Sequence, residues 1–420
     1  MSRILFFNIP AHGHTNPTLG MVRELVRRGH QVRYYSYEPM REKIEDTGAA
    51  FIACDSFDRE RHLSAKDAAR VGKDLAFSVE ILTDTTLALE EMVRRDVGRF
   101  KPDCIVADSM AVWGKAAALK YGIPFVSSTT TFAFNQYSSK IMGRRMREAF
   151  AFLLAMPKVG RQIKRLKNHG YPIKNVLDIL QNDNDTHTIV YTSPEFQPCA
   201  DTFSDKYAFV GASVRPAREE IIKTRDKLLY ISMGTVNNDM LPFYEQCIRA
   251  LAGTDYQVLL SVGNAVDARK LEELAECLLA DNLRTGSLYK GNPQTESLSE
   301  EIYADITVYR EVDQVGVLKK ADVFLTHCGM NSVNESLYFG VPLVMLPQTS
   351  EQRGVARRAA ELGAGILLES AEPAAVLKAV RRVTQEKAFG ENAGKISEGF
   401  RKCGGAERAA DKILEVIDIS

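Results

Sequence analysis

The chain has 420 residues, which is enough for two or three domains of ordinary size. Its 54 Lys and Arg residues balance its 54 Asp and Glu residues, and 45% of the chain is hydrophobic. Because a protein that binds nucleic acid through the phosphates normally carries a basic excess, we expect no nucleic-acid partner. The hydrophobic content also excludes an intrinsically disordered chain.

The sequence shows no targeting or membrane signal. The first apolar run, Ile4–Ile9, is shorter than the core of a signal peptide, and the longest one, Ala149–Met156, is far below the ~20 residues of a membrane span. The seven cysteines include no CxxC pair, which favours reduced thiols over disulfides or a zinc site. We therefore expect a cytoplasmic protein without a transmembrane segment.

Short apolar runs alternate with helical patterns along the first half of the chain. Strand Ile4–Ile9 ends at Pro10, and the next helix is expected to have Asn16 as N-cap, Pro17 at its first position and Gly29 as its stop. The alternation continues with strand Gln31–Tyr37, strand Cys104–Ala107, helix Ala111–Tyr121 closed by Gly122, and strand Ile123–Ser127. Continuous apolar strands are typical of a parallel sheet that is covered on both faces.

Residues 214–226, with Pro216 and a run of charges, interrupt the alternation and predict a linker. The pattern restarts at Lys227 with strands 228–233, 257–262, 306–312, 323–326 and 342–346, helices that begin at Pro242 and Ala268, and helices 314–321 and 331–339. Two such arrays predict an α/β protein of two doubly wound domains facing each other, with ligands in the cleft between them at the carboxyl ends of the strands. The expected domains are 1–213 and 227–404, and a helix in 405–420 is expected to pack back on the first domain.

Residues 139–170 depart from this pattern. They hold nine Lys or Arg residues and one acid, Glu148, around the apolar run 149–156. A lid over an apolar substrate, a weak contact with a membrane surface, and a solvated helical excursion all fit this composition.

Common nucleotide, hydrolase and metal motifs are absent from the sequence. It contains no GxxxxGK[ST], no GxGxxG after the first strand, no GxSxG and no HExxH, and its His and Cys residues lack the spacing of metal ligands. We therefore expect no metal and no bound cofactor.

One segment of the second half has the pattern of a phosphate site. His327 and Gly329 follow a strand, and Asn331 and Ser332 begin a helix whose free N–H groups and dipole favour an anion. Glu335 lies one turn further along the same helix face, where a carboxylate can accept ribose hydroxyls. A buried strand–helix corner with a capping Asn is the alternative interpretation.

His14 and Asp108 each lie at the carboxyl end of a strand in the first predicted sheet. An Asp bound to one imidazole nitrogen fixes the tautomer and stabilises the imidazolium that forms when the other nitrogen takes a proton. Such a pair can deprotonate a hydroxyl. Alternatively, His14 is only a hydrogen-bonded turn residue and Asp108 only the N-cap of the helix that begins near Ala111. His12 is the second candidate for the base.

Together these motifs resemble those of the family-1 glycosyltransferases of GT-B fold, in particular the bacterial macrolide-type UDP-glycosyltransferases. The resemblance is densest over 312–365 and implies two Rossmann-like domains around a deep cleft, a UDP-sugar donor, His14 as catalytic base and Asp108 as its partner. It also implies donor contacts to uracil from Val312 and Gln314, to the phosphates from His327, Gly329, Asn331 and Ser332, to ribose from Glu335, to the sugar from Glu351 and Gln352, and a loop beside the diphosphate at Gly234 and Thr235.

Three positions depart from that family's pattern. Cys328 stands where the family usually has the central Gly of His-Gly-Gly, and Glu311–Gln314 lacks the usual aromatic residue and Pro. Glu351 replaces the commoner Asp. These departures concern base affinity and sugar identity rather than the reaction class.

The resemblance implies an inverting, metal-independent hexosyltransferase that moves glucose from UDP-glucose to a hydroxyl of a lipophilic flavonoid, phenol or macrolide, with a thymidine-linked sugar as the second donor candidate. Another GT-B enzyme such as a UDP-sugar epimerase, and a non-catalytic glycosyltransferase-like partner, are the alternatives. The oligomeric state stays open. Candidate acceptor-pocket residues, which are of types more often found in the core, are Phe77, Trp113, Phe132, Phe134, Tyr137, Met142 and Phe150.

Overall fold

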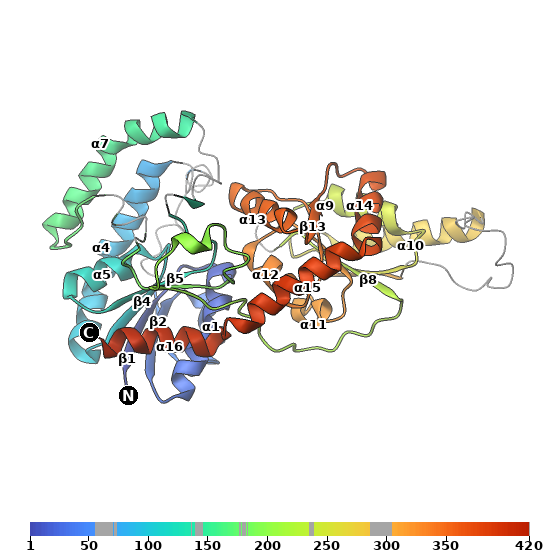
Figure 1. Cartoon of the computed structure of the whole chain (residues 1–420). Helices are drawn as coiled ribbons and strands as arrows, with labels where there is room; N and C mark the ends of the chain where they lie inside the picture. The colour runs from blue at the N-terminus through green and yellow to red at the C-terminus, as the bar shows by residue number, and fades with distance from the viewer. Residues whose placement is uncertain are drawn as a thin grey trace. The chain divides into compact units, whose positions relative to one another are not determined.

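The computed structural model describes residues 1–54, 70, 74–135, 137–138, 146–175, 178, 182, 184–234, 239–285 and 305–419. The chain forms two compact units (Figure 1). Unit 1 comprises Met1–Ser213 and Phe400–Ser420, and unit 2 comprises Val214–Gly399. Among the described helices, none is long and apolar enough to cross a membrane.

Unit 1 contains a parallel sheet in which the described strands follow the order β3-β2-β1-β4-β5-β6-β7. Successive side chains of the first strand enter two different cores, because Ile4 and Phe6 pack on one face and Leu5 and Phe7 on the other. The strands are β1 (Arg3–Phe7), β2 (Gln31–Ser36), β3 (Ala50–Ala53), β4 (Cys104–Asp108), β5 (Phe125–Thr129), β6 (Thr188–Val190) and β7 (Tyr207–Phe209).

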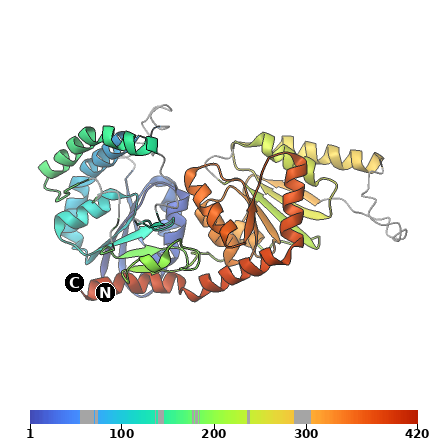
Figure 2. The same ribbon diagram turned by 45° about the horizontal axis from the view of Figure 1, so that its top comes forward.

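Helices cover both faces of this sheet. On one face α1 packs against α16, and on the other α4 and α5 pack against each other, with α7 lying on α4. Figure 2 shows the last helix ending near the start of the first strand. The helices of unit 1 are α1 (His12–Arg27), α2 (Arg41–Glu45), α4 (Leu75–Phe100), α5 (Val112–Tyr121), α7 (Met146–Asn168) and α16 (Gly405–Asp418), with 3-10 turns η1 (Glu38–Met40) and η4 (Ala200–Thr202).

The first helix begins one turn earlier than predicted. It starts at His12, so the expectation that Asn16 is its N-cap was wrong, and Pro17 lies inside the helix. The side-chain amide of Asn8 donates to the carbonyl oxygen of His14 at 3.1 Å, which anchors the new first turn to the end of β1. Because Pro17 removes only one intrahelical donor, the turn tolerates it.

Unit 2 contains a second parallel sheet, with the described strands in the order β10-β9-β8-β11-β12-β13. Its strands are β8 (Lys227–Ser232), β9 (Tyr256–Ser261), β10 (Asp305–Tyr309), β11 (Val323–Thr326), β12 (Leu343–Met345) and β13 (Gly365–Leu367). Its helices are α9 (Leu241–Leu251), α10 (Ala268–Thr285), α11 (Gln314–Leu318), α12 (Met330–Tyr338), α13 (Ser350–Glu361), α14 (Pro373–Gln385) and α15 (Lys387–Lys402), whose last residues belong to unit 1.

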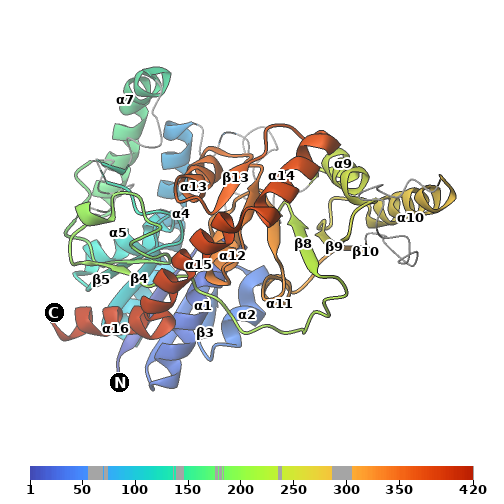
Figure 3. The ribbon, with the colours of Figure 1, turned by 45° about the vertical axis from the view of Figure 1, so that its right-hand side comes forward.

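Residues 214–226, here called the connector, belong to unit 2. The carboxylate of Asp313 accepts hydrogen bonds from the backbone N–H groups of Arg218 and Glu219 at 2.5 and 3.1 Å. Nearer to β8, Lys223 pairs with Asp322 at 2.7 Å. The connector therefore lies against the start of α11 before it enters β8 (Figure 3).

Candidate functional site

The carboxyl ends of three neighbouring strands of unit 1, namely β1, β4 and β5, bring three side chains together. Nδ1 of His14, in the first turn of α1, lies 2.8 Å from Oδ2 of Asp108, the last residue of β4. Oγ1 of Thr130, which follows β5, lies 3.1 Å from the same nitrogen. Because a carboxylate only accepts, Nδ1 carries the proton, and Nε2 of the neutral ring carries none.

Asp108 is held rigidly by its surroundings. Its side chain is fully buried, and Oδ1 accepts the backbone N–H of Met110 at 2.8 Å. The N-cap residue of α5 is Ala111, so the alternative role of Asp108 as N-cap does not apply. His12 is exposed and its Nδ1 lies 3.4 Å from Nζ of Lys43, so His14 and not His12 contacts Asp108.

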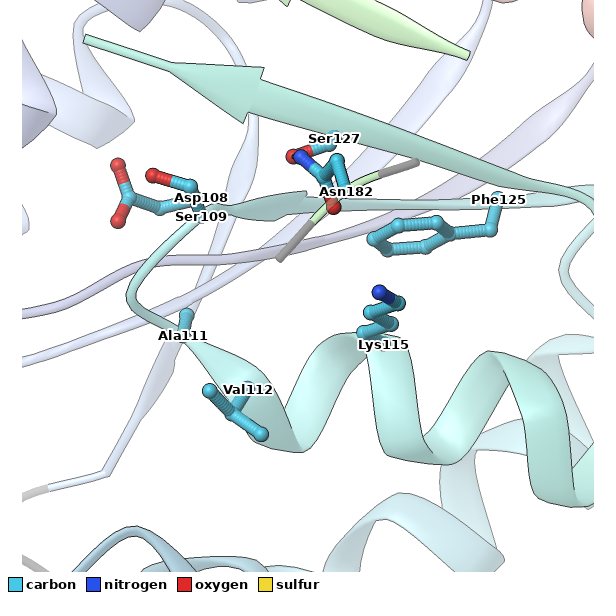
Figure 4. Close-up of a pocket in the computed structure, with 8 residues that line it drawn as sticks. All are labelled: Asp108, Ser109, Ala111, Val112, Lys115, Phe125, Ser127 and Asn182. Atoms are coloured by element: carbon cyan, nitrogen blue, oxygen red, sulfur yellow. The ribbon is translucent and has the colours of Figure 1, made fainter. Parts of the chain in front are cut away.

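A shallow pocket opens beside the dyad, between the ends of β4 and β5 and the start of α5 (Figure 4). It is small, with a cavity volume of about 20 Å³, and it is partly open to solvent. Asn182 donates to Oγ of Ser127 at 2.7 Å at its far side. Its lining is both polar and apolar and comprises Asp108, Ser109, Ala111, Val112, Lys115, Phe125, Ser127 and Asn182.

None of the five predicted acceptor residues whose side chains the structure describes lines this pocket. Trp113 and Phe132 are buried, the first in the core between the sheet and its helices and the second against the ring of Phe196 at 5.5 Å. Their large apolar surfaces stabilise unit 1, and a contact of either ring with an acceptor stays a prediction.

The other predicted acceptor residues differ in exposure. Phe77 is half-buried beneath the guanidinium of Arg70, at 4.1 Å, and Phe134 is also half-buried. Tyr137 is 49% exposed. Met142 and the side chain of Phe150 lie outside the described residues.

The described half of the basic region is a helix with two distinct faces. From residue 155 onward, α7 buries Val159, Ile163 and Leu166 against α4. Its Lys and Arg residues in this half, at 158, 161, 164, 165 and 167, are exposed. This arrangement fits the solvated helical excursion; residues 139–145 lie outside the described part of the chain.

In unit 2 the ring of His327 lies between two glycines at the ends of β8 and β11. A Cβ on Gly234 would lie 2.5 Å from Nε2 of His327, and one on Gly329 would lie 2.7 Å from the same atom. Burial lowers the pKa of His327 to about 4, although the backbone carbonyl of Ser232 opposes this shift. The imidazole is therefore a neutral N–H donor at pH 7. Thr235, predicted beside Gly234, lies outside the described residues.

The predicted phosphate site is a helix N-terminus, as the sequence pattern indicates. Gly329 is the N-cap of α12, and Asn331 and Ser332 lie in its first turn, where backbone N–H groups have no intrahelical partner. Cys328 takes the left-handed conformation, with φ of 68°, and its buried thiol donates to the carbonyl oxygen of Thr326 at 3.6 Å. The thiol thus points into the sheet, away from the helix N-terminus.

The predicted ribose and base residues meet each other. Nε2 of Gln314 donates to Oε2 of Glu335 at 2.6 Å and lies 3.4 Å from Oγ of Ser332. Burial raises the pKa of Glu335, while the hydrogen bond from Gln314 lowers it. Val312 is half-buried and precedes Gln314 by two residues. A carboxylate with one oxygen already bound to an amide forms the polar centre of this site.

The predicted sugar pair lies at the start of α13, after the next strand of the sheet. Oε1 of Gln352 accepts the N–H groups of Gln348 and Thr349 at 2.8 and 3.1 Å, and Oγ1 of Thr349 accepts the N–H of Gln352. This capping box occupies the oxygen of Gln352, and its NH₂ group takes no part in the box. Glu351 is exposed in the first turn.

Comparison with known proteins assigns the family. Residues 254–401 match the family described as UDP-glucoronosyl and UDP-glucosyl transferase. The chain is also 31% identical over 422 residues to the NDP-glycosyltransferase YjiC of Bacillus licheniformis, covering 98% of this chain and 96% of that protein. The chain belongs to the UDP-glycosyltransferase family. It is accordingly a hexosyltransferase, as the resemblance of its motifs implied.

Other matches to this UDP-glycosyltransferase extend over the whole chain. The demethyllactenocin mycarosyltransferase of Streptomyces fradiae is 27% identical, covering 98% of this chain and 86% of that one. The crystal structure of the glycotransferase of kitacinnamycin has a TM-score of 0.78 at 24% identity, covering 99% and 98% of the two chains. The GT-B fold expected from the motifs is therefore confirmed.

Sequence reasoning missed three polar or exposed residues of the UDP-glycosyltransferase site region. Thr130 directly follows β5 and Met110 lies two residues after the end of β4, positions that could have singled them out. Arg215, which pairs with Asp313, gave no such signal because it lies in the connector. Among the described residues, no three His, Cys, Asp or Glu side chains are grouped to hold a metal ion.

Proposed function

We propose that this enzyme is an inverting glycosyltransferase that moves a hexose, foremost glucose from UDP-glucose, to a hydroxyl of a lipophilic small molecule. The 2.8 Å contact between Nδ1 of His14 and Oδ2 of Asp108 carries the proposal. Nε2 of His14 takes the acceptor's proton while the acceptor oxygen attacks the anomeric carbon from the face opposite UDP. The bond from that carbon to the diphosphate oxygen breaks, UDP leaves, and Asp108 stabilises the imidazolium.

The donor role falls to unit 2. In the proposal, the first N–H groups of α12 and the neutral ring of His327 stabilise the charge on the departing diphosphate, so no metal ion is required. Gln314 and the backbone near Val312 bind the uracil, and Glu335 accepts the ribose hydroxyls. Gln352, through its NH₂ group, binds the sugar hydroxyls together with Glu351. Gly234 and Gly329 allow the backbone to approach the diphosphate.

A lipophilic acceptor is supported by an exposed apolar side chain near the base. Met110 is 51% exposed, and its N–H donates to the carboxylate of Asp108. When an apolar ligand covers such a side chain, apolar surface is removed from water and the complex is stabilised. The demethyllactenocin mycarosyltransferase among the relatives is consistent with a macrolide-like acceptor, and flavonoids and phenols are the other candidates.

Mass spectrometry after incubation with UDP-glucose and a panel of phenols, flavonoids and macrolides tests the proposal. We expect products heavier by one hexose, and none with His14→Ala, which should still be stabilised by UDP. Altered UDP-sugar without an acceptor product would favour an epimerase. Stabilisation by UDP without consumption of any UDP- or thymidine-linked sugar would favour a non-catalytic binding protein.

A further inference from the structure

The connector carries a cation into the neighbourhood of the nucleotide-binding residues. The guanidinium of Arg215 donates to Oδ1 of Asp313, while Oδ2 of Asp313 accepts the N–H groups of Arg218 and Glu219. Burial raises the pKa of Asp313, but these hydrogen bonds outweigh burial and hold it below its usual value. Asp313 is thus a buried, ionised carboxylate that depends on its partners.

Asp313 directly precedes Gln314, whose side chain binds Glu335 at 2.6 Å. The charge of Asp313 therefore lies near enough to oppose the ionisation of Glu335. Gln314 on α11 bonds Glu335 directly. The charged and titratable groups that act on Glu335 are Asp313 at the N-cap of α11, Arg215 on the connector and the buried Tyr230 on β8. Oγ of Ser332, on the same helix as Glu335, completes the set.

The positive charge of Arg215 balances the negative charge of Asp313 near Glu335. Burial and the charge of Asp313 raise the pKa of Glu335, whereas the hydrogen bond of Gln314 and the charge of Arg215 lower it. Without Arg215, the carboxylate of Asp313 would keep only two backbone donors and would act on Glu335 uncompensated. The side chain of Asp313 is 3% exposed, so salt in solution screens this interaction poorly.

We infer that Arg215 is a positioning residue of the nucleotide site, which neutralises Asp313 and so keeps Glu335 as a carboxylate able to accept the two ribose hydroxyls. This inference rests on the proposed function, in which Glu335 binds ribose. Arg215 acts through Glu335 and needs no contact with the nucleotide. The acid at position 313, where the family pattern has Pro, thereby has its compensating charge on the connector.

Calorimetric titration of UDP into the full chain between pH 5 and pH 8 tests this role. Arg215→Gln should weaken UDP binding several-fold at pH 6 and less at pH 8, because loss of the guanidinium raises the pKa of Glu335 and so lowers its ionised fraction at the lower pH. If Arg215 only stabilised the fold of the connector, Arg215→Gln would lower UDP affinity by the same factor at every pH.

Two further variants separate charge balance from folding. Arg215→Gln combined with Asp313→Asn should restore UDP affinity at pH 6 to within ~3-fold of wild type, because the Asn oxygen still accepts the connector N–H groups without a charge. Lys223→Gln breaks the other connector ion pair, 2.7 Å long, and should leave the pH profile unchanged.

A pH profile of Arg215→Gln that parallels the wild-type profile, or no recovery in the double variant, would overturn the inference. Failure of the wild-type protein to bind UDP at any pH would instead overturn the proposed function. If Lys223→Gln shifted the profile as Arg215→Gln does, the effect would belong to the connector as a whole and the inference would fall.

Discussion

Asp108 holds Nδ1 of His14 at 2.8 Å through one oxygen, while its other oxygen accepts the N–H of Met110 at the same distance. The two contacts fix which oxygen faces the imidazole. The carboxylate cannot rotate without losing one of them, and it is fully buried. The tautomer of His14 is therefore set by the backbone that follows β4 as much as by the charge of Asp108.

Asp108→Asn should lower kcat by ~10²–10⁴-fold with little change in UDP affinity. The N–H of Met110 would retain the Asn oxygen, so the Asn NH₂ group would face Nδ1 of His14 and donate to it. The imidazole proton would then move to Nε2, where it blocks the base. Steady-state rates and thermal unfolding check this, and a variant with normal kcat would remove Asp108 from the mechanism.

Glu335→Ala should weaken UDP binding by ~1–3 kcal/mol, because two ribose hydrogen bonds to a carboxylate are lost. Glu311→Ala is the matched control, since this acid is exposed and lies three residues before Gln314. Titration calorimetry measures both variants. Equal affinity in Glu335→Ala and wild type would exclude Glu335 from the nucleotide site.

Cys328→Val should destabilise unit 2 by more than ~1 kcal/mol, because a β-branched residue at φ of 68° is strained. Cys328→Gly removes the same thiol without that strain and should retain UDP binding. Urea unfolding followed by circular dichroism is the suitable measurement, because the single Trp, Trp113, lies in unit 1 and does not report on this site. Identical midpoints for the Val and Gly variants would contradict this reasoning.

The stability of unit 2 should decrease as the pH falls from about 6.5 towards 4. Burial lowers the pKa of His327 to about 4, so in this window the unfolded chain takes up a proton that the folded chain does not. Stability from this group is complete above pH 6.5. His327→Gln should flatten that part of the curve, measured as the free energy of unfolding at pH 7 and pH 5. An unchanged slope would show that other groups cause it.

Met110→Ala should raise KM for lipophilic acceptors ~10-fold, which corresponds to about 1.5 kcal/mol of lost apolar contact. Leu119→Ala is the control, because Leu119 is also an exposed apolar side chain, at 45%, but lies near the end of α5. UDP affinity should stay unchanged in both. A similar KM in the two variants would show that Met110 does not contact the acceptor.

Local signals predicted most of the alternating framework. Gly122 closes α5 with φ of 64°, and the strand 323–326 has the predicted bounds, because each depends on residues adjacent in sequence. The predicted start of α1 was wrong because the hydrogen bond from the Asn8 side chain to the carbonyl oxygen of His14 outweighs the capping preference of Asn16. Capping rules consider about four neighbouring residues and take no account of tertiary contacts.

In the candidate site, too, some contacts were predictable from the sequence and others were not. The meeting of His14 and Asp108 followed from their places at the ends of strands, although 94 residues separate them. The pairing of Arg215 with Asp313 could not be predicted in this way, because a run of charges in a connector has the same pattern as any solvated segment. The inward direction of the Cys328 thiol likewise depends on a single backbone dihedral.

The return of the chain to unit 1 affects its biosynthesis. Ile413 of α16 packs in the same core as Ile4 and Phe6 of the first strand. On the ribosome, unit 2 has all of its residues available while the earlier sheet still lacks α16, which covers one apolar face together with α1. Unit 1, whose strands are synthesised first, is thus the last unit to be completed. A nonsense codon before Gly405 would leave both sets of catalytic groups encoded and yield a nascent protein exposed to proteases and aggregation.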